Sequence, residues 1–362
     1  GAVAVAETFS LAKLYSIRKL ADLTALGITA ENNALLRQTV ADFYSEAVEG
    51  TQVYVIGYPD TLKMSDVLNK ENPYLKKVIE ETNGELRGLA VTSVPAAVPV
   101  IADGLDSDVS IAVANGHALG EWARTVRYAP GFVLIDGLSY DGAPATLKDQ
   151  KLGSNYRAAV VIGSLTPDAA NQCIGIVAGR IATTSVEGNI GRVSDGPLNA
   201  IAMYAGDLNI SVADVETIYD KGYITFRTFT GVGGYYIADD LMTTAETDDY
   251  NHLTAVRTID KAMRIAYAVL VQQLLDKVQV RSDGTMLQPV IVSWQQIIEN
   301  AIASNMTALD ELSSDNGDSG VQVYIDPAQD ILATSTILVE VRVRPFGYAR
   351  YINVTLGFTI NE

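Results

Sequence analysis

The sequence predicts a mixed fold. We expect an α/β domain with a mostly parallel or mixed sheet over residues 1–200, followed by an α+β domain over residues 201–362 that ends in two C-terminal strands. In the first half, short apolar runs alternate with amphipathic helical segments, which is typical of a sheet covered by helices on both faces. At the end, two consecutive runs alternate apolar and polar residues with a period of two, which indicates half-buried strands.

The first domain is predicted from continuous apolar runs and from apolar residues that recur at spacings of three and four. The expected strands are 52–58, 86–91, 132–135 and 158–162. The expected helices are 30–47, 74–82, 117–128 and 169–182. The glycine-rich stretch 188–198 predicts a long irregular connection, and we place the domain boundary near it.

The second domain begins with a short mixed segment, 212–219, and a strand at 224–229 that leads into a glycine-rich turn. The longest apolar stripe in the chain predicts a helix over 253–278, and a second amphipathic helix is expected over 294–306. A strand at 321–325 precedes the two terminal strands.

The terminal strands are predicted over 337–344 and 351–360. A strand near the end of a chain has a free edge unless something pairs with it, and a free edge is a template for another chain. We therefore expect assembly by strand pairing between subunits, although a strand that completes the sheet of its own domain is the alternative. The residues expected to carry this pairing are Val339, Val341, Val343, Ile352, Val354, Leu356 and Phe358.

Composition limits the classes of partner. The chain of 362 residues has a net charge of −17, which argues against nucleic acid and against an anionic membrane surface. The most apolar stretch, 89–105, is interrupted by Pro95, Pro99 and Asp103, so we expect no membrane insertion. The single cysteine, Cys173, excludes an internal disulfide and is expected to be a buried structural thiol.

Signals for chemistry are weak. The two histidines, His117 and His252, have no ligand at metal-binding spacing, and no nucleophile elbow is present. The glycines at 231–234 lack the spacing of a nucleotide-binding loop and are interpreted as a tight turn. Asp239 and Asp240 are interpreted as solvated loop charges. We therefore expect no enzyme, no catalytic residue, no metal site and no cofactor.

The order of motifs in the second half is familiar. A strand and glycine turn at 223–240 lead into a helix with Arg257-Thr258-Ile259-Asp260-Lys261, and the chain then reaches its two terminal strands with Pro345 between them. This order resembles the tail sheath proteins of contractile bacteriophages and related contractile injection machines. The start of the chain, from residue 7 to residue 44, is similar to a sheath-like branch found in phages and prophages.

The resemblance implies a structural role in a contractile tail. Sheath subunits form stacked hexameric rings around an inner tube, are linked by strands, and contract to drive the tube through a cell envelope. The implied partners are other sheath subunits, the inner tail tube protein, and the baseplate and tail terminator proteins. The implied location is the contractile tail of a virion, assembled in the bacterial host cytoplasm. Arg257 and Arg264, about two helical turns apart, are expected to contact the tube or a neighbouring subunit, with a packed salt bridge inside the domain as the alternative.

Two other functions remain open at this point. One is another virion or surface assembly protein with a similar pair of terminal strands. The other is an α/β enzyme, which would need a deep pocket with clustered carboxylates or a bound phosphate.

Overall fold

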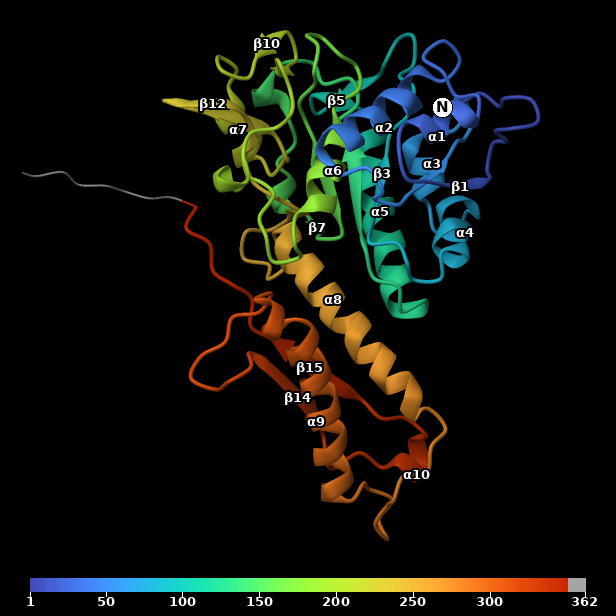
Figure 1. Cartoon of the computed structure of the whole chain (residues 1–362), viewed down its shortest axis with the longest axis vertical. Coiled ribbons are helices and arrows are strands. Elements are labelled where there is room, and N and C mark those ends of the chain that lie inside the picture. Colours follow the sequence, from blue (N-terminus) through green and yellow to red (C-terminus); the bar gives the residue numbers. More distant parts are fainter. Residues whose placement is uncertain (351–362) are drawn as a thin grey trace, which may run out of the picture. The chain divides into compact units, whose positions relative to one another are not determined.

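The computed structural model describes residues 1–350, and its contacts divide the chain into two compact units, Gly1–Ala268 and Val269–Glu362. Both units contain helices and strands, so the predicted mixture is confirmed (Figure 1). The contacts group residues 201–268 with the first unit. The predicted domain boundary near residue 200 stays a prediction.

The first unit holds most of the elements. Its helices are α1 (Ala21–Ala25), α2 (Ala34–Glu46), α3 (Met64–Leu68), α4 (Tyr74–Glu81), α5 (Asp108–Val126), α6 (Ile174–Thr183), α7 (Val215–Asp220) and α8 (Leu253–Leu270), which continues two residues into the second unit. Its strands are β1 (Leu14–Ile17), β2 (Val53–Ile56), β3 (Gly88–Val91), β4 (Ile101–Ala102), β5 (Leu105–Asp106), β6 (Phe132–Asp136), β7 (Ser154–Asn155), β8 (Ala158–Val161), β9 (Tyr204–Ala205), β10 (Leu208–Asn209), β11 (Phe226–Phe229), β12 (Val232–Ile237) and β13 (Thr243–Thr244).

A parallel sheet with the order β3-β6-β8 forms the centre of this unit. Every residue of β6 and of β8 is buried, because helices cover the sheet and a strand buried on both faces needs an unbroken apolar sequence. Helix α5 packs on one face, where Gly116 lies over Val133 and Ile135. The sequence prediction began this helix at residue 117. It begins at Asp108 instead, because Gly116 serves helix–sheet contact and does not end or start the helix.

Two glycines set how closely α6 and α2 approach. A Cβ atom at Gly175 would overlap the carbonyl oxygen of Thr39, and one at Gly179 would overlap that of Phe43. Since Gly175 and Gly179 are four residues apart, they lie on one face of α6. The missing side chains therefore let the two backbones come into direct contact.

The N-terminal part of the first unit has a small core of its own. Strands β1 and β2 pair antiparallel, with Leu14 opposite Ile56. The core beneath them consists of Phe9, Ile17, Leu23, Ile28, Val40 and Val55.

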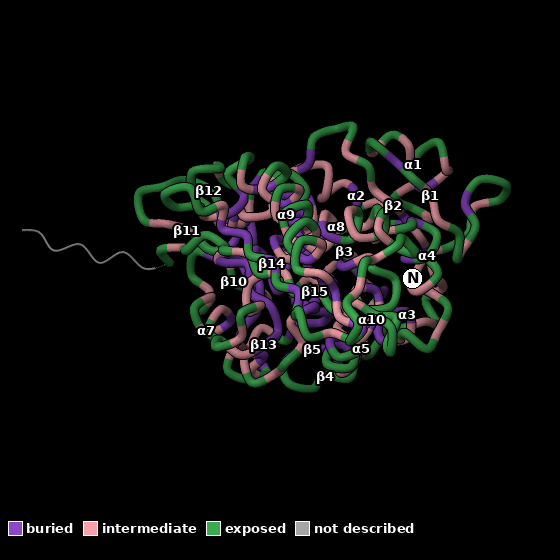
Figure 2. The backbone as a smooth tube through the Cα atoms, turned by 90° about the horizontal axis from the view of Figure 1, so that it is seen from below, coloured by how far each residue is buried: buried purple, intermediate pink, exposed green. Residues whose placement is uncertain are grey.

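The remaining strands of this unit are short. Ile224 bridges Val161 in parallel and so extends the central sheet by one position. Strands β11 and β12 form an antiparallel hairpin through Gly231, whose φ of +79° suits a glycine turn. The tip of β12 and the loop around β4 are exposed (Figure 2).

The second unit contains α9 (Gln288–Asn305), α10 (Ile331–Thr334), β14 (Val321–Ile325) and β15 (Val339–Val343). Strands β14 and β15 form a two-stranded antiparallel sheet, and α9 packs on β14. The buried residues of its small core are Met286, Ile291 and Ile325.

Three further predicted segments differ from the structure. The helix expected over 253–278 ends at Leu270, because Leu274 and Leu275 beyond it are exposed and give no buried face to hold further turns. The helix expected over 294–306 begins earlier, at Gln288, and has a proline in its first turn. Proline is tolerated there because an N–H in the first turn has no acceptor within the helix. The mixed segment near 212–219 contains α7.

The two terminal strands have different outcomes. The first is present as β15, at Val339–Val343. The second, predicted over 351–360, lies outside the described residues. In the part of the chain from residue 1 to residue 350, no helix combines the length and apolar character needed to cross a membrane.

We predict that Gly175→Ala destabilises the protein. In a helix interior with free space this change stabilises by about 0.5–1 kcal/mol, because alanine has less backbone freedom to lose. At Gly175 the added methyl group meets the backbone of α2, so we expect the unfolding free energy to fall by about 1–3 kcal/mol in urea titrations.

Gly116→Ala is the matched control in α5. A Cβ at Gly116 meets its nearest atoms at 3.4 Å, which is ordinary van der Waals contact, so stability should stay equal or rise. Equal effects of the two substitutions would contradict the close approach of α2 and α6.

Candidate functional site

Strand β15 carries three of the predicted assembly residues, Val339, Val341 and Val343. All three are half-buried and lie on one face of the sheet, since they alternate along the strand. Their partners on β14 are Ile325, Val323 and Val321, which are buried. This apolar face of the sheet is the one turned toward α9, whereas the opposite face is exposed.

The two outer edges of this sheet differ. On β14, the N–H of Val323 donates to Oε1 of Glu299 at 2.9 Å, and its carbonyl accepts from Nε2 of Gln295 at 3.0 Å, so α9 covers that edge. Directly opposite residues of an antiparallel pair either bond each other or both point outward, so the N–H of Val341 points to the outer edge of β15. Among residues 1–350, no strand pairs with that edge.

The other predicted assembly residues are Ile352, Val354, Leu356 and Phe358. They lie outside the described residues, and their role in pairing stays a prediction.

Arg257 and Arg264 make hydrogen bonds within the first unit. Arg257 donates to the carbonyl oxygens of Ile181 and Thr184, at the end of α6. Arg264 donates to the carbonyl oxygen of Pro130 at 2.8 Å, and burial lowers its pKa to about 10. These are carbonyl contacts that help to fix α8 in the first unit. Contact of the two arginines with a tube or a neighbour stays a prediction.

A buried ion pair lies next to them. Nη1 of Arg157 is 2.6 Å from Oδ1 of Asp260, and both side chains are almost completely buried. Glu121 of α5 accepts from Nε of the same arginine at 3.1 Å. Burial raises the pKa of Asp260, and the adjacent guanidinium opposes that rise. Arg157, directly before β8, therefore links α8 and α5 to the central sheet. Its buried charge is compensated by the carboxylates of Asp260 and Glu121.

Asp239, Asp240 and His252 come together where β12 ends and α8 begins. The two carboxylates are buried, so the interpretation of them as solvated loop charges is wrong. Nδ1 of His252 is 3.1 Å from Oδ1 of Asp240 and 3.8 Å from Oδ1 of Asp239. Sequence spacing did not reveal this cluster, because His252 follows Asp240 by twelve residues and the chain between them forms a loop.

Among residues 1–350 this is the group whose ligand atoms are close enough to hold a metal ion. The carboxylate oxygens already accept protein donors. Nδ2 of Asn189 donates to Asp239 at 2.6 Å and to Asp240 at 2.9 Å, and the N–H of Thr254 donates to Asp240 at 2.7 Å. Asp240 thus satisfies a free N–H in the first turn of α8, so the cluster acts as a cap for that helix.

The carboxyl ends of the central strands hold one more buried acid. Asp136 accepts hydrogen bonds from Thr92, from Asn171 and from the N–H of Gln172. Burial raises its pKa to about 6, although these bonds oppose the rise. Cys173 follows Gln172 in the sequence. It is buried as predicted, and burial raises the pKa of its thiol.

We predict that Asp260→Asn lowers the unfolding free energy by about 3 kcal/mol, because it leaves Arg157 buried with half of its partners. Unfolding titrations with guanidinium chloride measure this loss of free energy. Asp195→Asn is the control, since it breaks an exposed pair with Arg192 and should cost at most about 1 kcal/mol. Equally small losses in both variants would contradict a structural role for the buried pair.

We predict that Asp136 makes the protein less stable as pH rises from about 4 to about 6. Its pKa of about 6 in the folded chain exceeds the ordinary value near 3.9, so the folded state binds more protons in that window. The expected loss is roughly 2–3 kcal/mol. This loss should appear in the difference between wild type and Asp136→Asn when urea titrations are repeated across that pH range, because asparagine does not titrate. Parallel pH profiles for the two proteins would disprove the assignment.

The chain is similar to proteins of known structure. It is similar to a chain in the cryo-EM structure of the anti-feeding prophage (AFP) baseplate, 6-fold symmetrised, with a TM-score of 0.64 and 16% identity over 96% of this chain and 88% of that one. It is similar to a chain of the PVC sheath complex in the contracted state, from an extracellular contractile injection system, with a TM-score of 0.64 and 15% identity over 98% of this chain and 90% of that one. The sheath tail protein of Desulfitobacterium hafniense matches with a TM-score of 0.40 and 13% identity over 71% of this chain and 54% of that one.

The first two matches establish a shared fold along almost the whole chain. The resemblance to contractile sheath proteins that was predicted from the sequence is confirmed at this level. No curated protein matches the sequence. Two family models do: the DUF2586 N-terminal domain over residues 2–241 and the DUF2586 C-terminal domain over residues 249–362. The chain therefore belongs to the DUF2586 family.

Proposed function

We propose that this protein is a structural subunit of a contractile tail sheath. Its subunits would polymerise by strand addition into stacked hexameric rings around an inner tube, and contraction of the rings would drive the tube through a cell envelope. The observation that carries the proposal is the fold shared with the contracted PVC sheath chain over 98% of the residues.

The edge of β15 supports a role in assembly. A two-stranded sheet is marginal by itself, and an edge with free N–H and C=O groups gains hydrogen bonds when another strand joins it. Strand addition uses the backbone for affinity and the alternating side chains for register. Val339, Val341 and Val343 would hold β15 against its own unit, and residues 351–360 would supply pairing to a neighbour, with Ile352, Val354, Leu356 and Phe358 filling its pockets.

The net charge of the chain opposes unspecific association of subunits. At a net charge of −17, free subunits repel each other, so contact between them must be built from backbone hydrogen bonds and apolar area. In this proposal the energy for contraction is stored in the extended assembly. The partners are other subunits, the inner tube protein, and the baseplate and terminator proteins of a phage-like particle assembled in the host cytoplasm.

A second candidate function is a structural component of the baseplate. The equal TM-score to the chain from the AFP baseplate favours it. The two functions differ in the assembly that they predict: a sheath subunit forms tubes of many stacked rings, and a baseplate component forms a single ring.

The test removes one backbone donor from the outer edge of β15. Val341→Pro deletes the N–H that points away from β14, and proline is tolerated at such edge positions. We expect tubes from the wild-type chain in negative-stain images and none from Val341→Pro. Deletion of residues 351–362 should likewise leave the far-UV circular dichroism nearly unchanged and abolish tubes.

Val341→Ala is the matched control, because it shortens the same side chain and keeps the N–H. It should still assemble, and its thermal transition should lie close to that of Val341→Pro. Tubes from both Val341→Pro and the deletion variant would refute strand addition as the link. Single rings from the wild-type chain would favour the baseplate function.

A further inference from the structure

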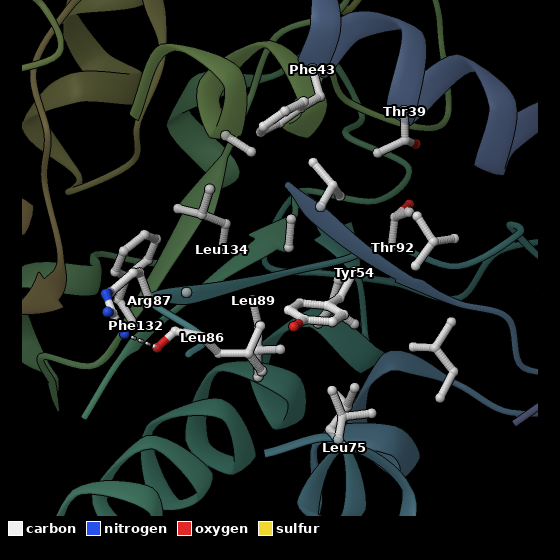
Figure 3. A pocket seen from close by; sticks show the side chains of 18 of the residues that line it. Thr39, Phe43, Tyr54, Leu75, Leu86, Arg87, Leu89, Thr92, Phe132 and Leu134 are labelled. Carbon is white, nitrogen blue, oxygen red and sulfur yellow. Dashed lines mark hydrogen bonds between the residues drawn. The ribbon is translucent and has the colours of Figure 1, made fainter. Parts of the chain in front are cut away.

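The first unit contains a cavity of about 990 Å³ between β2 and β3 (Figure 3). Its lining includes every residue from 51 to 59 and from 85 to 93. Neighbouring residues of a strand point to opposite faces, so an unbroken run lines a cavity only when the edge of the strand borders it. The cavity therefore lies between two strand edges. We call it the β2–β3 cavity.

The two strand edges that border this cavity face each other without pairing. Strand β2 pairs with β1, and β3 pairs with β6, but the two sheets remain separate. No backbone hydrogen bond joins β2 to β3 within the described residues. Since the N–H and C=O groups of such edges need water when no strand pairs with them, an occupant of the cavity must be slim enough to leave the edges hydrated.

Helices supply apolar walls on both sides of the strands. Phe43 of α2 lies on one side, and Leu75 of α4 lies on the other (Figure 3). Ala178 of α6 and Met64 of α3 also line the cavity. Small-molecule sites in proteins are mostly apolar cavities of about 300–1,000 Å³ with a few polar groups that fix the ligand. The β2–β3 cavity has this size and lining, so its walls suit an aliphatic ligand.

One end of the cavity is cationic. Arg87 directly precedes β3, and Arg264 donates to the carbonyl oxygen of Pro130, two residues before β6. Because β3 and β6 are parallel, with Gly88 opposite Phe132, both arginines lie at the end where these strands begin. Burial lowers the pKa of Arg264 to about 10, and the positive charge of Arg87 acts in the same direction, so the two guanidinium groups are near each other.

Neither arginine makes an ion pair with a carboxylate among residues 1–350. The hydrogen bonds of both side chains go to backbone carbonyl oxygens. The two acidic residues of the lining already have partners: Asp260 pairs with Arg157 at 2.6 Å, and Glu85 accepts from the hydroxyl of Tyr54. Two neighbouring guanidinium groups without a carboxylate form a site for an anion, because bonds to an ionised acceptor are stronger than bonds to a neutral one.

The balance of charge around the whole cavity points the same way. The lining has five cationic residues against two acidic ones, in a chain whose net charge is −17. The cationic residues are Lys63, Arg87, Arg257, Lys261 and Arg264. An anion that most of this protein repels is therefore attracted to the cavity.

We propose that the β2–β3 cavity binds an anionic amphiphile, in which one unbranched alkyl chain carries a single carboxylate or phosphate head. The head would lie on Arg87 and Arg264, and the alkyl chain would lie between the walls from α2 and α4. A single alkyl chain is slim and leaves the strand edges hydrated, whereas a bulky apolar ligand would strip them of water at a high cost. The site belongs to the single chain, so it is compatible with a sheath subunit and with a baseplate component.

Isothermal titration calorimetry of the full chain with laurate and with dodecyl phosphate, below their critical micelle concentrations, tests the proposal. We expect one site per chain for at least one of these anions, and the anion that binds more tightly identifies the head group. Dodecanol has the same alkyl chain without a charge and should bind at least about tenfold more weakly. Absence of saturable binding of both anions, or equal affinity for dodecanol, would overturn the proposal.

Two charge substitutions test the position of the head. Arg87→Gln and Arg264→Gln should each weaken binding of the tighter anion at least about tenfold. Arg227→Gln is the matched control, because it removes an exposed arginine of β11 outside the cavity lining and should leave the affinity unchanged. Equal affinities of Arg87→Gln and wild type, or equal losses in Arg87→Gln and Arg227→Gln, would refute the head site. Arg87 is exposed, so this comparison decides the question even if Arg264→Gln does not fold.

A third substitution tests the position of the alkyl chain. Ala90 of β3 is exposed and lines the cavity, so Ala90→Phe narrows the cavity and should weaken binding at least about tenfold. Ala114→Phe, at an exposed alanine of α5 outside the lining, should leave the affinity unchanged. Far-UV circular dichroism checks that both variants are folded. A folded Ala90→Phe chain that binds the anion as tightly as wild type would contradict a ligand in this cavity.

Discussion

Backbone N–H and C=O groups at the edge of a β-strand need a partner, from water or from another strand. In the second unit, α9 meets this need on one side, where Gln295 and Glu299 bond to Val323. On the other side the edge of β15 has no strand beside it among the described residues. In the first unit the same constraint applies twice, at the facing edges of β2 and β3. A protein with such edges either protects them or uses them to pair with another strand.

Buried charges hold the framework that presents these edges. The pair of Arg157 with Asp260 fixes α8 to the central sheet, and Asp240 caps the first turn of the same helix. Such interactions add little stability compared with apolar packing, but they are costly to break and therefore hold one geometry. The close contact of α2 with α6 through Gly175 and Gly179 acts in the same way, because it allows one separation of the two backbones.

The candidate site shows how far sequence patterns reach. The period-two pattern placed β15 within two residues of its bounds and identified Val339, Val341 and Val343 as one face. The same reasoning about spacing missed the cluster of Asp239, Asp240 and His252, because metal-ligand and catalytic patterns are sought at short range and this loop closes over twelve residues. Arg257 and Arg264 were found from their helix, but their carbonyl partners at the end of α6 and at Pro130 have no sequence signal.

The sequence by itself determined the local structure: which runs are strands or helices, which faces are apolar, that Cys173 is buried, and that the motifs follow the sheath order. These properties depend on neighbours within a few residues, where side-chain periodicity is decisive. Only the tertiary structure decided that Gly116 lies inside α5 and not at its start, that two adjacent aspartates are buried, and that β2 and β3 face each other without pairing. Each of these depends on distances between residues far apart in the chain, and those distances are set by how the elements pack.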